Sequence, residues 1–199
     1  MTERGEVESR ILDAAERVFA ERGVRRARMG EVAEAAGCSR ATLYRYFATK
    51  EALVADYALR ELERISETLL LSLATRPALG DRLLEALALA VEAVRARPAI
   101  APFLSPEAQG LTSALPIESG ALGPALLGTF VAVTTGHDGR ERLRPEIPEA
   151  EILEWSVRLV LSLALAPGPS RTSTELRAFL GRLVRPSFVV PSPVRDKNR

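Results

Sequence analysis

The sequence predicts an all-α fold of about nine helices, and three observations support this prediction. Apolar residues recur at the three- and four-residue spacing of a helix along most of the 199-residue chain. No segment of useful length alternates between apolar and polar residues, as a half-buried strand does. Only one of the 13 prolines, Pro77, lies within residues 1–97. Long helices are therefore expected in the first half, and shorter helices ended by prolines in the second.

The first four expected helices have recognisable starts or ends. Gly23 and Gly37 follow the first two, and glycine is the usual residue just after a helix. Ser39 is expected to cap the third helix and Thr49 the fourth, because a hydroxyl oxygen can accept a free N–H group of the first turn. These helices are expected over residues 6–22, 29–36, 40–46 and 50–73.

Helices in the second half are expected to be separated by loops rich in proline and glycine. They are expected over residues 81–97, 98–104, 121–136, 149–166 and 173–185, with loops over 105–120 and 136–140. The helix over 121–136 is almost uncharged and is expected to be buried. Pro148 fits the first position of the helix that follows it. Residues 186–199 contain three prolines and a basic end, and are expected to form a flexible tail.

The composition excludes several kinds of site. The chain has one cysteine and one histidine, which rules out an internal disulfide, a cysteine-based metal cluster and any metal site with two histidines. The N-terminus is acidic and polar, unlike a signal peptide, and no apolar run reaches the length of a membrane span. We therefore expect an intracellular, cytoplasmic protein without a bound metal or cofactor.

An enzymatic function is not expected, and no residue is predicted to be catalytic. Nucleophilic catalysis would have to use His137, which is interpreted as a surface histidine in a turn, with a ligand contact as the alternative. The sequence has no Gly-rich loop of the kind that binds phosphates. The carboxylate pairs Glu61/Glu63 and Glu149/Glu151 are expected on solvated helix faces.

Charge is distributed unevenly, although the net charge is only +1. Residues 22–50 contain seven basic and two acidic residues, whereas residues 51–170 contain 10 basic and 16 acidic ones. A short basic segment beside an acidic core is the pattern expected of a protein that binds a polyanion through one end. Residues 171–199 are also basic, and are interpreted as a solubilising terminus, with a second nucleic-acid contact as the alternative.

The first three expected helices form a helix-turn-helix pattern, in which the second and third are joined by a short turn that contains Gly37. In this motif the third helix enters the major groove of DNA and its first residues reach the base edges. Leu43 and Phe47 are four residues apart and are expected to face inward. The outward-facing groups that can contact phosphates or bases belong to Arg40, Thr42, Tyr44, Arg45 and Tyr46, and Arg40 can read a guanine with two hydrogen bonds.

The run from Glu31 to Leu53, EVAEAAGCSRATLYRYFATKEAL, closely resembles the N-terminal domain of TetR-family transcriptional repressors, a resemblance that covers about residues 6–55. Residues 151–185 resemble the last two helices of many actinobacterial-type members, whereas residues 75–150 show no specific resemblance. The resemblance implies a homodimeric repressor that binds double-stranded DNA at a palindromic operator and has no membrane partner. The DNA contacts that it implies are made by Arg28, Ser39, Arg40, Ala41, Thr42, Tyr44, Arg45, Tyr46 and Lys50.

Three residues depart from the family pattern. Arg28 stands where a threonine usually caps the second helix, and a guanidinium cannot accept the free N–H groups. We therefore expect the cap to be lost or replaced, and Arg28 to contact a phosphate. Gly30 offers no side chain where family members often contact DNA. Cys38 stands where valine is common and is interpreted as a small packing residue, with a redox switch as the alternative.

The family resemblance divides the chain into a DNA-binding domain over residues 1–48, a helical domain over 49–185 and the tail over 186–199. A small hydrophobic or amphipathic effector is expected to contact Leu87, Val91, Phe103, Phe130 and Trp155, although Trp155 can also be interpreted as a packing residue. A four-helix dimer interface is expected to use Leu159, Leu163, Leu176, Phe179, Leu180 and Leu183, some of which must face the subunit core instead. Two alternatives stay open: an architectural or activating DNA-binding protein without a ligand, and a helical enzyme with a vestigial DNA-binding domain.

Overall fold

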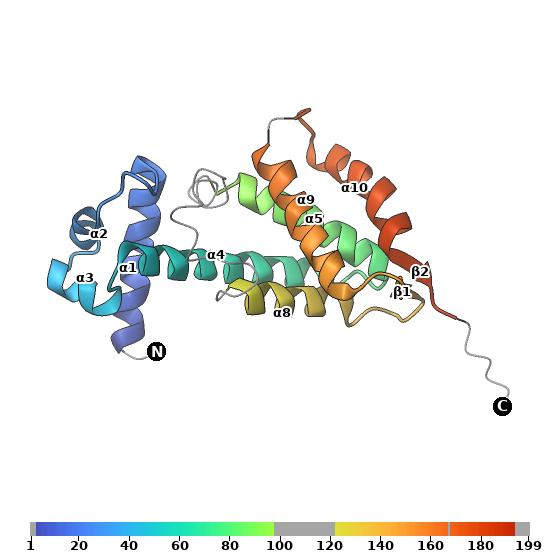
Figure 1. Ribbon diagram of the computed structural model, residues 1–199, viewed down its shortest axis with the longest axis horizontal. Helices are drawn as coiled ribbons and strands as arrows, with labels where there is room; N and C mark the ends of the chain where they lie inside the picture. The colour runs from blue at the N-terminus through green and yellow to red at the C-terminus, as the bar shows by residue number, and fades with distance from the viewer. Residues whose placement is uncertain (1–2, 98–121, 167, 194–199) are drawn as a thin grey trace. The chain divides into compact units, whose positions relative to one another are not determined.

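The computed structural model describes residues 3–97, 122–166 and 168–193 (Figure 1). The chain divides into two compact units, of which the first contains residues 1–64 and 96–125 and the second residues 65–95 and 126–199. The described residues form eight α-helices and one pair of three-residue strands, which confirms the all-α class. The helix expected over 98–104 and the loop expected over 105–120 lie outside the described residues. Among the described helices, none combines the length and the apolar character needed to cross a bilayer.

The helices at the N-terminal end begin and end close to the predicted positions. They are α1 (Glu3–Arg22), α2 (Met29–Ala35), α3 (Arg40–Tyr46) and α4 (Lys50–Leu73). The Ser39 hydroxyl accepts the Thr42 N–H at 3.0 Å, and the Thr49 hydroxyl accepts the Ala52 N–H at 3.1 Å. Both predicted caps are therefore confirmed. Gly23 has a φ of 72°, a left-handed conformation that glycine adopts without strain.

The core of the first unit is built by α1, α2, α3 and the beginning of α4. The predicted inward orientation of Leu43 and Phe47 is confirmed, since their exposed fractions are 0% and 1%. Phe19 and Tyr57 pack edge to face, with ring centroids 5.5 Å apart. The other buried side chains of this core include Ile11, Ala14, Ala15, Val18, Val32, Ala33, Leu53 and Val54. Apolar burial of this kind is what stabilises such short helices, because isolated helices of seven residues are not stable in water.

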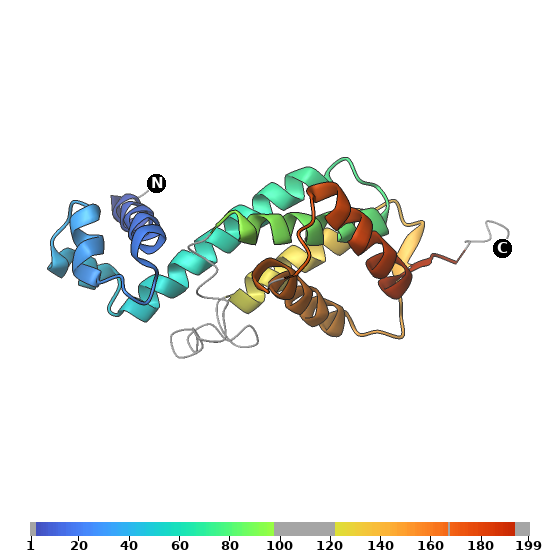
Figure 2. The ribbon, with the colours of Figure 1, turned by 90° about the horizontal axis from the view of Figure 1, so that it is seen from above.

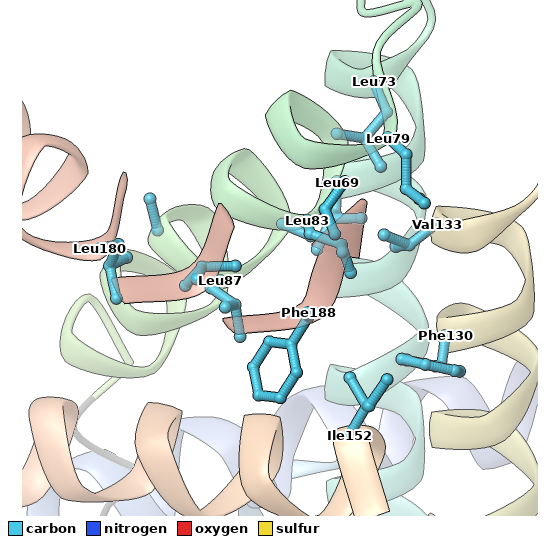
Figure 3. Close-up of a cluster of buried hydrophobic side chains, with 14 of the residues drawn as sticks. Leu69, Leu73, Leu79, Leu83, Leu87, Phe130, Val133, Ile152, Leu180 and Phe188 are labelled. Atoms are coloured by element: carbon cyan, nitrogen blue, oxygen red, sulfur yellow. The ribbon is translucent and has the colours of Figure 1, made fainter. Parts of the chain in front are cut away.

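The second unit is built around α5 (Leu79–Arg95), which packs against both α9 (Glu149–Leu165) and α10 (Ser173–Phe188). Figure 3 shows the buried side chains that α5 shares with its neighbours, among them Leu83, Leu87, Leu180 and Phe188. A capping box begins α10: the Thr172 hydroxyl accepts the Glu175 N–H at 3.3 Å, and the Glu175 carboxylate accepts the Thr172 N–H at 2.8 Å.

Helix α8 (Leu122–Thr134) is only partly buried, which corrects the prediction of a buried helix over residues 121–136. Its second half lies alongside the end of α4 in both views (Figures 1 and 2), and the hydroxyls of Ser66 and Thr129 are 2.7 Å apart there. Phe130 is buried in the core, whereas Leu127 is 53% exposed and Val131 45% exposed. A helix that is apolar on all sides carries no pattern from which its buried face can be predicted.

The last helix is longer than predicted, and the segment after it is partly ordered. Helix α10 continues through Pro186 to Phe188, and β2 (Val189–Pro191) then pairs antiparallel with β1 (Glu141–Leu143). Phe188 and Val189 are 7% and 8% exposed. Their burial stabilises this extension, so the prediction of a flexible tail is wrong for residues 186–191. Residues 194–199 lie outside the described residues.

Arg82 is a charged residue inside the second unit, 8% exposed. Its guanidinium donates to the carbonyl oxygens of Leu73 at 2.9 Å, Ala132 at 2.9 Å and Val133 at 2.8 Å. These carbonyls belong to the last turns of α4 and α8, where carbonyl groups lack partners within their own helix. Arg82 therefore joins the C-terminal ends of two helices.

Glu61 is also buried, with 1% of its surface exposed. Its carboxylate accepts hydrogen bonds from Arg64 at 2.7 Å and from Arg97 at 2.9 Å. Arg64 also forms an ion pair with Glu16 of α1 at 3.4 Å. The expectation that Glu61 lies on a solvated face is therefore wrong, because an arginine 36 positions away in the sequence supplies a partner that helix periodicity cannot predict. Glu63, the other member of that pair, is exposed.

Candidate nucleic-acid interface

Helices α2 and α3 form the predicted helix-turn-helix. The turn between them passes through Gly37, whose φ is 63°, and the Cys38 N–H donates to the Ala33 carbonyl at 3.0 Å. The Arg17 guanidinium of α1 donates to the carbonyl of Ala35 at 3.0 Å, so α1 is tied to the end of α2. The motif is thus held by a backbone hydrogen bond in the turn, by the Arg17 side chain and by the buried Leu43.

The outer side of α3 presents polar side chains at its surface. Arg40 and Arg45 are exposed, and Tyr44 is 49% exposed. Ala41 is exposed in the first turn, where its small side chain permits a close approach to DNA. Phenol and guanidinium groups at these positions can donate to phosphate oxygens or base edges.

The hydroxyls of Ser39 and Thr42 serve the helix itself. Ser39 Oγ accepts the Thr42 N–H, and the two hydroxyl oxygens are 2.9 Å apart. This pair fixes the first turn of α3. Because a hydroxyl has one donor and two acceptor positions, one of the two hydroxyls can still donate to a phosphate.

Tyr46 lies near two cations. The guanidinium carbon of Arg45 is 5.5 Å from the centroid of the Tyr46 ring, and that of Arg4 is 5.9 Å from it. Contacts at these distances are cation–π interactions. Arg4 from α1 was not among the predicted site residues, and its separation in the sequence from Tyr46 leaves no signal that could have found it.

Next to α3 lies an open cavity of about 1150 Å³. Its cationic lining comes from Arg22, Arg25, Arg26, Arg28, Arg40 and Lys50, and the carboxylates of Glu21, Glu31 and Glu34 lie at the same cavity. The sequence allows two interpretations of Arg25 and Arg26, as part of an ordinary solvated loop or as neighbours of a phosphate. Arg22 is not among the predicted contact residues, and the signal that could have found it is the local charge of residues 22–50, which includes the loop as well as the helices.

The five arginines that line this cavity have no internal partner for their guanidinium groups within the described residues. Within the part of the chain that the structure describes, those of Arg22, Arg25, Arg26, Arg28 and Arg40 form no hydrogen bond or ion pair with another residue. Arginines in the second unit such as Arg82 and Arg177 donate instead to carbonyls or carboxylates. Unpaired donors concentrated on one face are available to phosphates.

Lys50 holds the start of α4 against the loop that follows α1. Its ammonium donates to the Arg25 carbonyl at 3.1 Å. Burial lowers the pKa of Lys50, and the carboxylates of Glu51 and Glu31 offset part of this effect. An ammonium has three donors, so Lys50 can hold Arg25 in place and also bind a phosphate.

The first turn of α2 shows how the missing threonine cap is replaced. Arg28 makes no capping hydrogen bond with its side chain. The Glu31 carboxylate instead accepts the Arg28 N–H at 2.9 Å, as the acidic member of a capping box does. The expectation that the cap is lost or replaced is confirmed, and the Arg28 side chain is left exposed.

The positions predicted for an effector are only partly brought together. Leu87, Val91 and Phe130 lie in the hydrophobic core of the second unit. Trp155 is 36% exposed and packs edge to face on Phe188, with centroids 4.8 Å apart. Phe103 lies outside the described residues.

The positions predicted for a dimer interface fall into two groups. Leu176 and Leu180 are 1% and 0% exposed, because they fill the core between α10 and α5, and they are therefore among the members of the set that face the subunit core. Leu183 is 43% exposed, and Leu159, Leu163 and Phe179 are partly buried. These four stay a prediction.

His137 and Cys38 each have two interpretations from the sequence, and both are half-buried in turns. His137 is half-buried and its Nδ1 accepts the Gly139 N–H at 3.1 Å, which stabilises the turn before β1. Cys38 is a free cysteine, half-buried in the turn of the helix-turn-helix.

Comparisons with known proteins agree with this geometry. Residues 11–57 match the model of the bacterial regulatory proteins of the tetR family. The chain is 34% identical over 185 residues to an uncharacterized HTH-type transcriptional regulator of Mycobacterium tuberculosis, found in two strains, and the match covers 92% of this chain and 85% of the relative.

Solved structures share the fold over most of its length. The fatty acid degradation regulator FadR from Bacillus halodurans has a TM-score of 0.63 at 18% identity, covering 89% of this chain and 93% of that one. FadR from Bacillus subtilis in complex with stearoyl-CoA has a TM-score of 0.58 at 15% identity, covering 88% and 94%. AibR in complex with isovaleryl coenzyme A and operator DNA has a TM-score of 0.56 at 17% identity, covering 92% and 100%. The helix-turn-helix, the family match and the relatives together show that the chain belongs to the TetR family of DNA-binding transcriptional regulators.

Proposed function

We propose that this protein is a dimeric repressor that a small-molecule effector releases from a palindromic operator. The observation that carries the proposal is the row of guanidinium groups beside α3 that have no partner within the described ranges, at the face where a helix-turn-helix meets DNA. In a dimer, two copies of α3 would enter successive major grooves, about 34–36 Å apart.

The proposal is tested with the purified full-length protein and DNA from upstream of its own gene. Fluorescence anisotropy is expected to show binding that weakens steeply with salt and that prefers a palindromic duplex over a scrambled duplex of equal length and composition. Equal affinity for the two duplexes at every salt concentration would contradict operator recognition.

The dimer is proposed to form through α9 and α10, two helices from each subunit. The exposed Leu183 and the partly buried Leu159, Leu163 and Phe179 supply apolar surface for this contact. Light scattering is the test: Leu183→Glu is expected to reduce the dimer fraction, whereas Leu71→Glu, at a position that is 79% exposed, serves as the control. A wild-type protein that is monomeric at micromolar concentration would contradict this proposal.

The effector is proposed to be an amphipathic molecule with an apolar chain, held among α5, α8 and α9. The described part of this region is rich in apolar side chains, including Leu87, Val91 and Phe130. Two proteins of the same fold have been solved with acyl-coenzyme A thioesters, stearoyl-CoA and isovaleryl coenzyme A, which makes this class the first to test.

Release requires the effector to bind the DNA-free conformation more tightly than the DNA-bound one, because equal affinity for both shifts no equilibrium. Acyl-CoA thioesters of increasing chain length are therefore added to the protein–operator complex, with free coenzyme A and free fatty acids as controls. The expected result is release by one range of chain lengths. If none of these compounds, nor a wider set of apolar metabolites, lowers operator affinity, the ligand-independent alternative is favoured.

A further inference from the structure

Gly30 and Arg40 share one small volume at the junction of α2 and α3. A Cβ atom placed on Gly30 would lie 2.7 Å from Arg40 Nη2, 2.9 Å from Nε and 3.0 Å from Cζ. Cβ atoms essentially never lie within 3.0 Å of a non-bonded atom, so the guanidinium would have to move if position 30 carried a side chain. The Arg40 guanidinium therefore occupies the space that a side chain at position 30 would fill.

Arg40 is well placed to read a base. It is the first residue of α3 and is exposed, and the first residues of a recognition helix are those that reach base edges. It shares its cavity with Tyr44 and Lys50. Its guanidinium has no hydrogen bond or ion pair with any other residue in the described ranges, so its planar set of donors is open.

We propose that Gly30 is a specificity-determining residue that acts by positioning Arg40 to read a guanine in the major groove. The absence of a side chain at position 30 leaves room for the guanidinium to lie against the first turn of α2. A bidentate contact to O6 and N7 of guanine needs the guanidinium to approach the base pair in one orientation, and a side chain at position 30 would displace it. This inference rests on the proposed operator binding. It assigns the recognition of one base pair of the operator to Arg40 and Gly30 together.

The fold allows Gly30 to be changed without loss of structure. Its φ is not in the left-handed region, unlike those of Gly23 and Gly37, so alanine fits the backbone. Only the end of the flexible Arg40 side chain has to move. Alanine also has a higher helix propensity than glycine, and Gly30→Ala therefore separates the positioning of Arg40 from folding.

The experiment uses the full-length wild-type protein to select duplexes from a random pool, and then replaces each selected G·C pair in turn. Affinity is measured by fluorescence anisotropy for the wild type, Gly30→Ala, Arg40→Lys, Arg40→Ala and the double variant Gly30→Ala/Arg40→Ala. Gly128→Ala is the matched control, because Gly128 also lies in a helix but a Cβ atom placed on it would meet no neighbouring atom within 4 Å. Thermal melting is recorded for every variant.

We expect one G·C pair whose replacement weakens wild-type binding by about tenfold or more. Arg40→Lys keeps the charge but loses the fork, so the penalty for replacing this pair is expected to fall below about threefold. Gly30→Ala is expected to reduce the same penalty while its melting temperature stays unchanged. In the Arg40→Ala background, Gly30→Ala is expected to leave the penalty for replacing this pair unchanged. Gly128→Ala is expected to keep the wild-type penalty.

Three results would overturn the inference. In the first two, replacing the G·C pair weakens binding by Arg40→Lys, or by Gly30→Ala, as much as it weakens binding by the wild type. In the third, Gly30→Ala changes this loss of affinity equally in the wild-type and the Arg40→Ala backgrounds. If Gly30→Ala melts well below the wild type, its effect on DNA is attributed to folding and the inference is also overturned. Failure of the wild type to select any sequence is a different outcome, since it contradicts operator binding itself.

Discussion

The guanidinium of Arg177 in α10 forms two parallel hydrogen bonds with the carboxylate of Glu85 in α5, at 2.7 and 3.0 Å. A further donor of Arg177 reaches Glu92, about two turns further along the same face of α5, at 2.7 Å. Glu85 also forms an ion pair with Arg76 at 3.2 Å. Two carboxylates and an arginine thus join the two helices that form the centre of the second unit.

This cluster predicts a dependence of stability on pH. Hydrogen bonds from Arg177 are the main cause that lowers the pKa of Glu85 and of Glu92 below the ordinary value of 4.5. A carboxyl whose pKa is lower in the folded state stabilises the fold above its unfolded pKa, and this stabilisation is lost as the pH falls through the folded pKa. Urea unfolding is therefore expected to show a loss of stability from about pH 5 downward.

The control for this prediction is Arg177→Met, which removes the cause of both shifts. This substitution is expected to lower the free energy of unfolding by about 2 kcal/mol at pH 7. Removing one partner of a fully buried ion pair would cost more, but Arg177 is partly exposed. The variant should also lose less stability than the wild type between pH 5 and pH 3. Parallel pH profiles for the two proteins would contradict the assignment.

Arg82 is expected to tolerate no substitution, including lysine. Its three nitrogens donate to carbonyls at the ends of two helices, and one ammonium cannot reach all of them. We expect Arg82→Lys to reduce the free energy of unfolding by about 2 kcal/mol and Arg82→Met by about 3 kcal/mol. Arg158→Lys is the control, because Arg158 forms an exposed ion pair with Glu154 within one helix, and this substitution is expected to cost less than about 0.5 kcal/mol.

Glu61 is expected to differ sharply from its neighbour Glu63. Glu61→Gln keeps the shape of the side chain but removes the charge between Arg64 and Arg97, and is expected to cost about 2 kcal/mol of stability. Glu63→Gln, on the exposed side of the same helix, is expected to have almost no effect. Denaturant unfolding of the two variants measures the difference, and equal values would show that the buried pairs contribute nothing.

The loop arginines are expected to bind phosphates. Each phosphate that a basic side chain neutralises contributes about 0.9 to the slope of log affinity against log salt concentration. Arg25→Ala is therefore expected to weaken binding to all duplexes about equally and to reduce this slope by about one. Arg142→Ala is the control, since Arg142 is an exposed arginine of β1; a reduced slope in both variants would indicate a general charge effect instead.

The N-terminal helices could be predicted to within a few residues, because local chemistry determines where they end. Ser39 and Thr49 cap helices from the side chain, and Gly23 and Gly37 adopt the left-handed conformation after them. The candidate DNA contacts of α3 followed from the same short-range pattern.

Features that depend on distant partners could not be predicted. The apolar residues of α10 repeat along the whole helix, so the sequence does not separate the buried Leu176 and Leu180 from the exposed Leu183. Arg177 and Glu85 are 92 positions apart, and the close approach of Arg40 to Gly30 requires the packed geometry of two helices. Such pairings become visible only when the tertiary structure is known.

The pairing of Leu143 with Val189 has a consequence for the order of folding. The two strands lie at opposite ends of the segment that contains α9 and α10, so their pairing closes a long loop and has a high entropic cost in the unfolded chain. That cost falls once both helices have docked on α5. The strand pair is therefore expected to form late, and its amide protons are expected to exchange with solvent before those of the helices it joins.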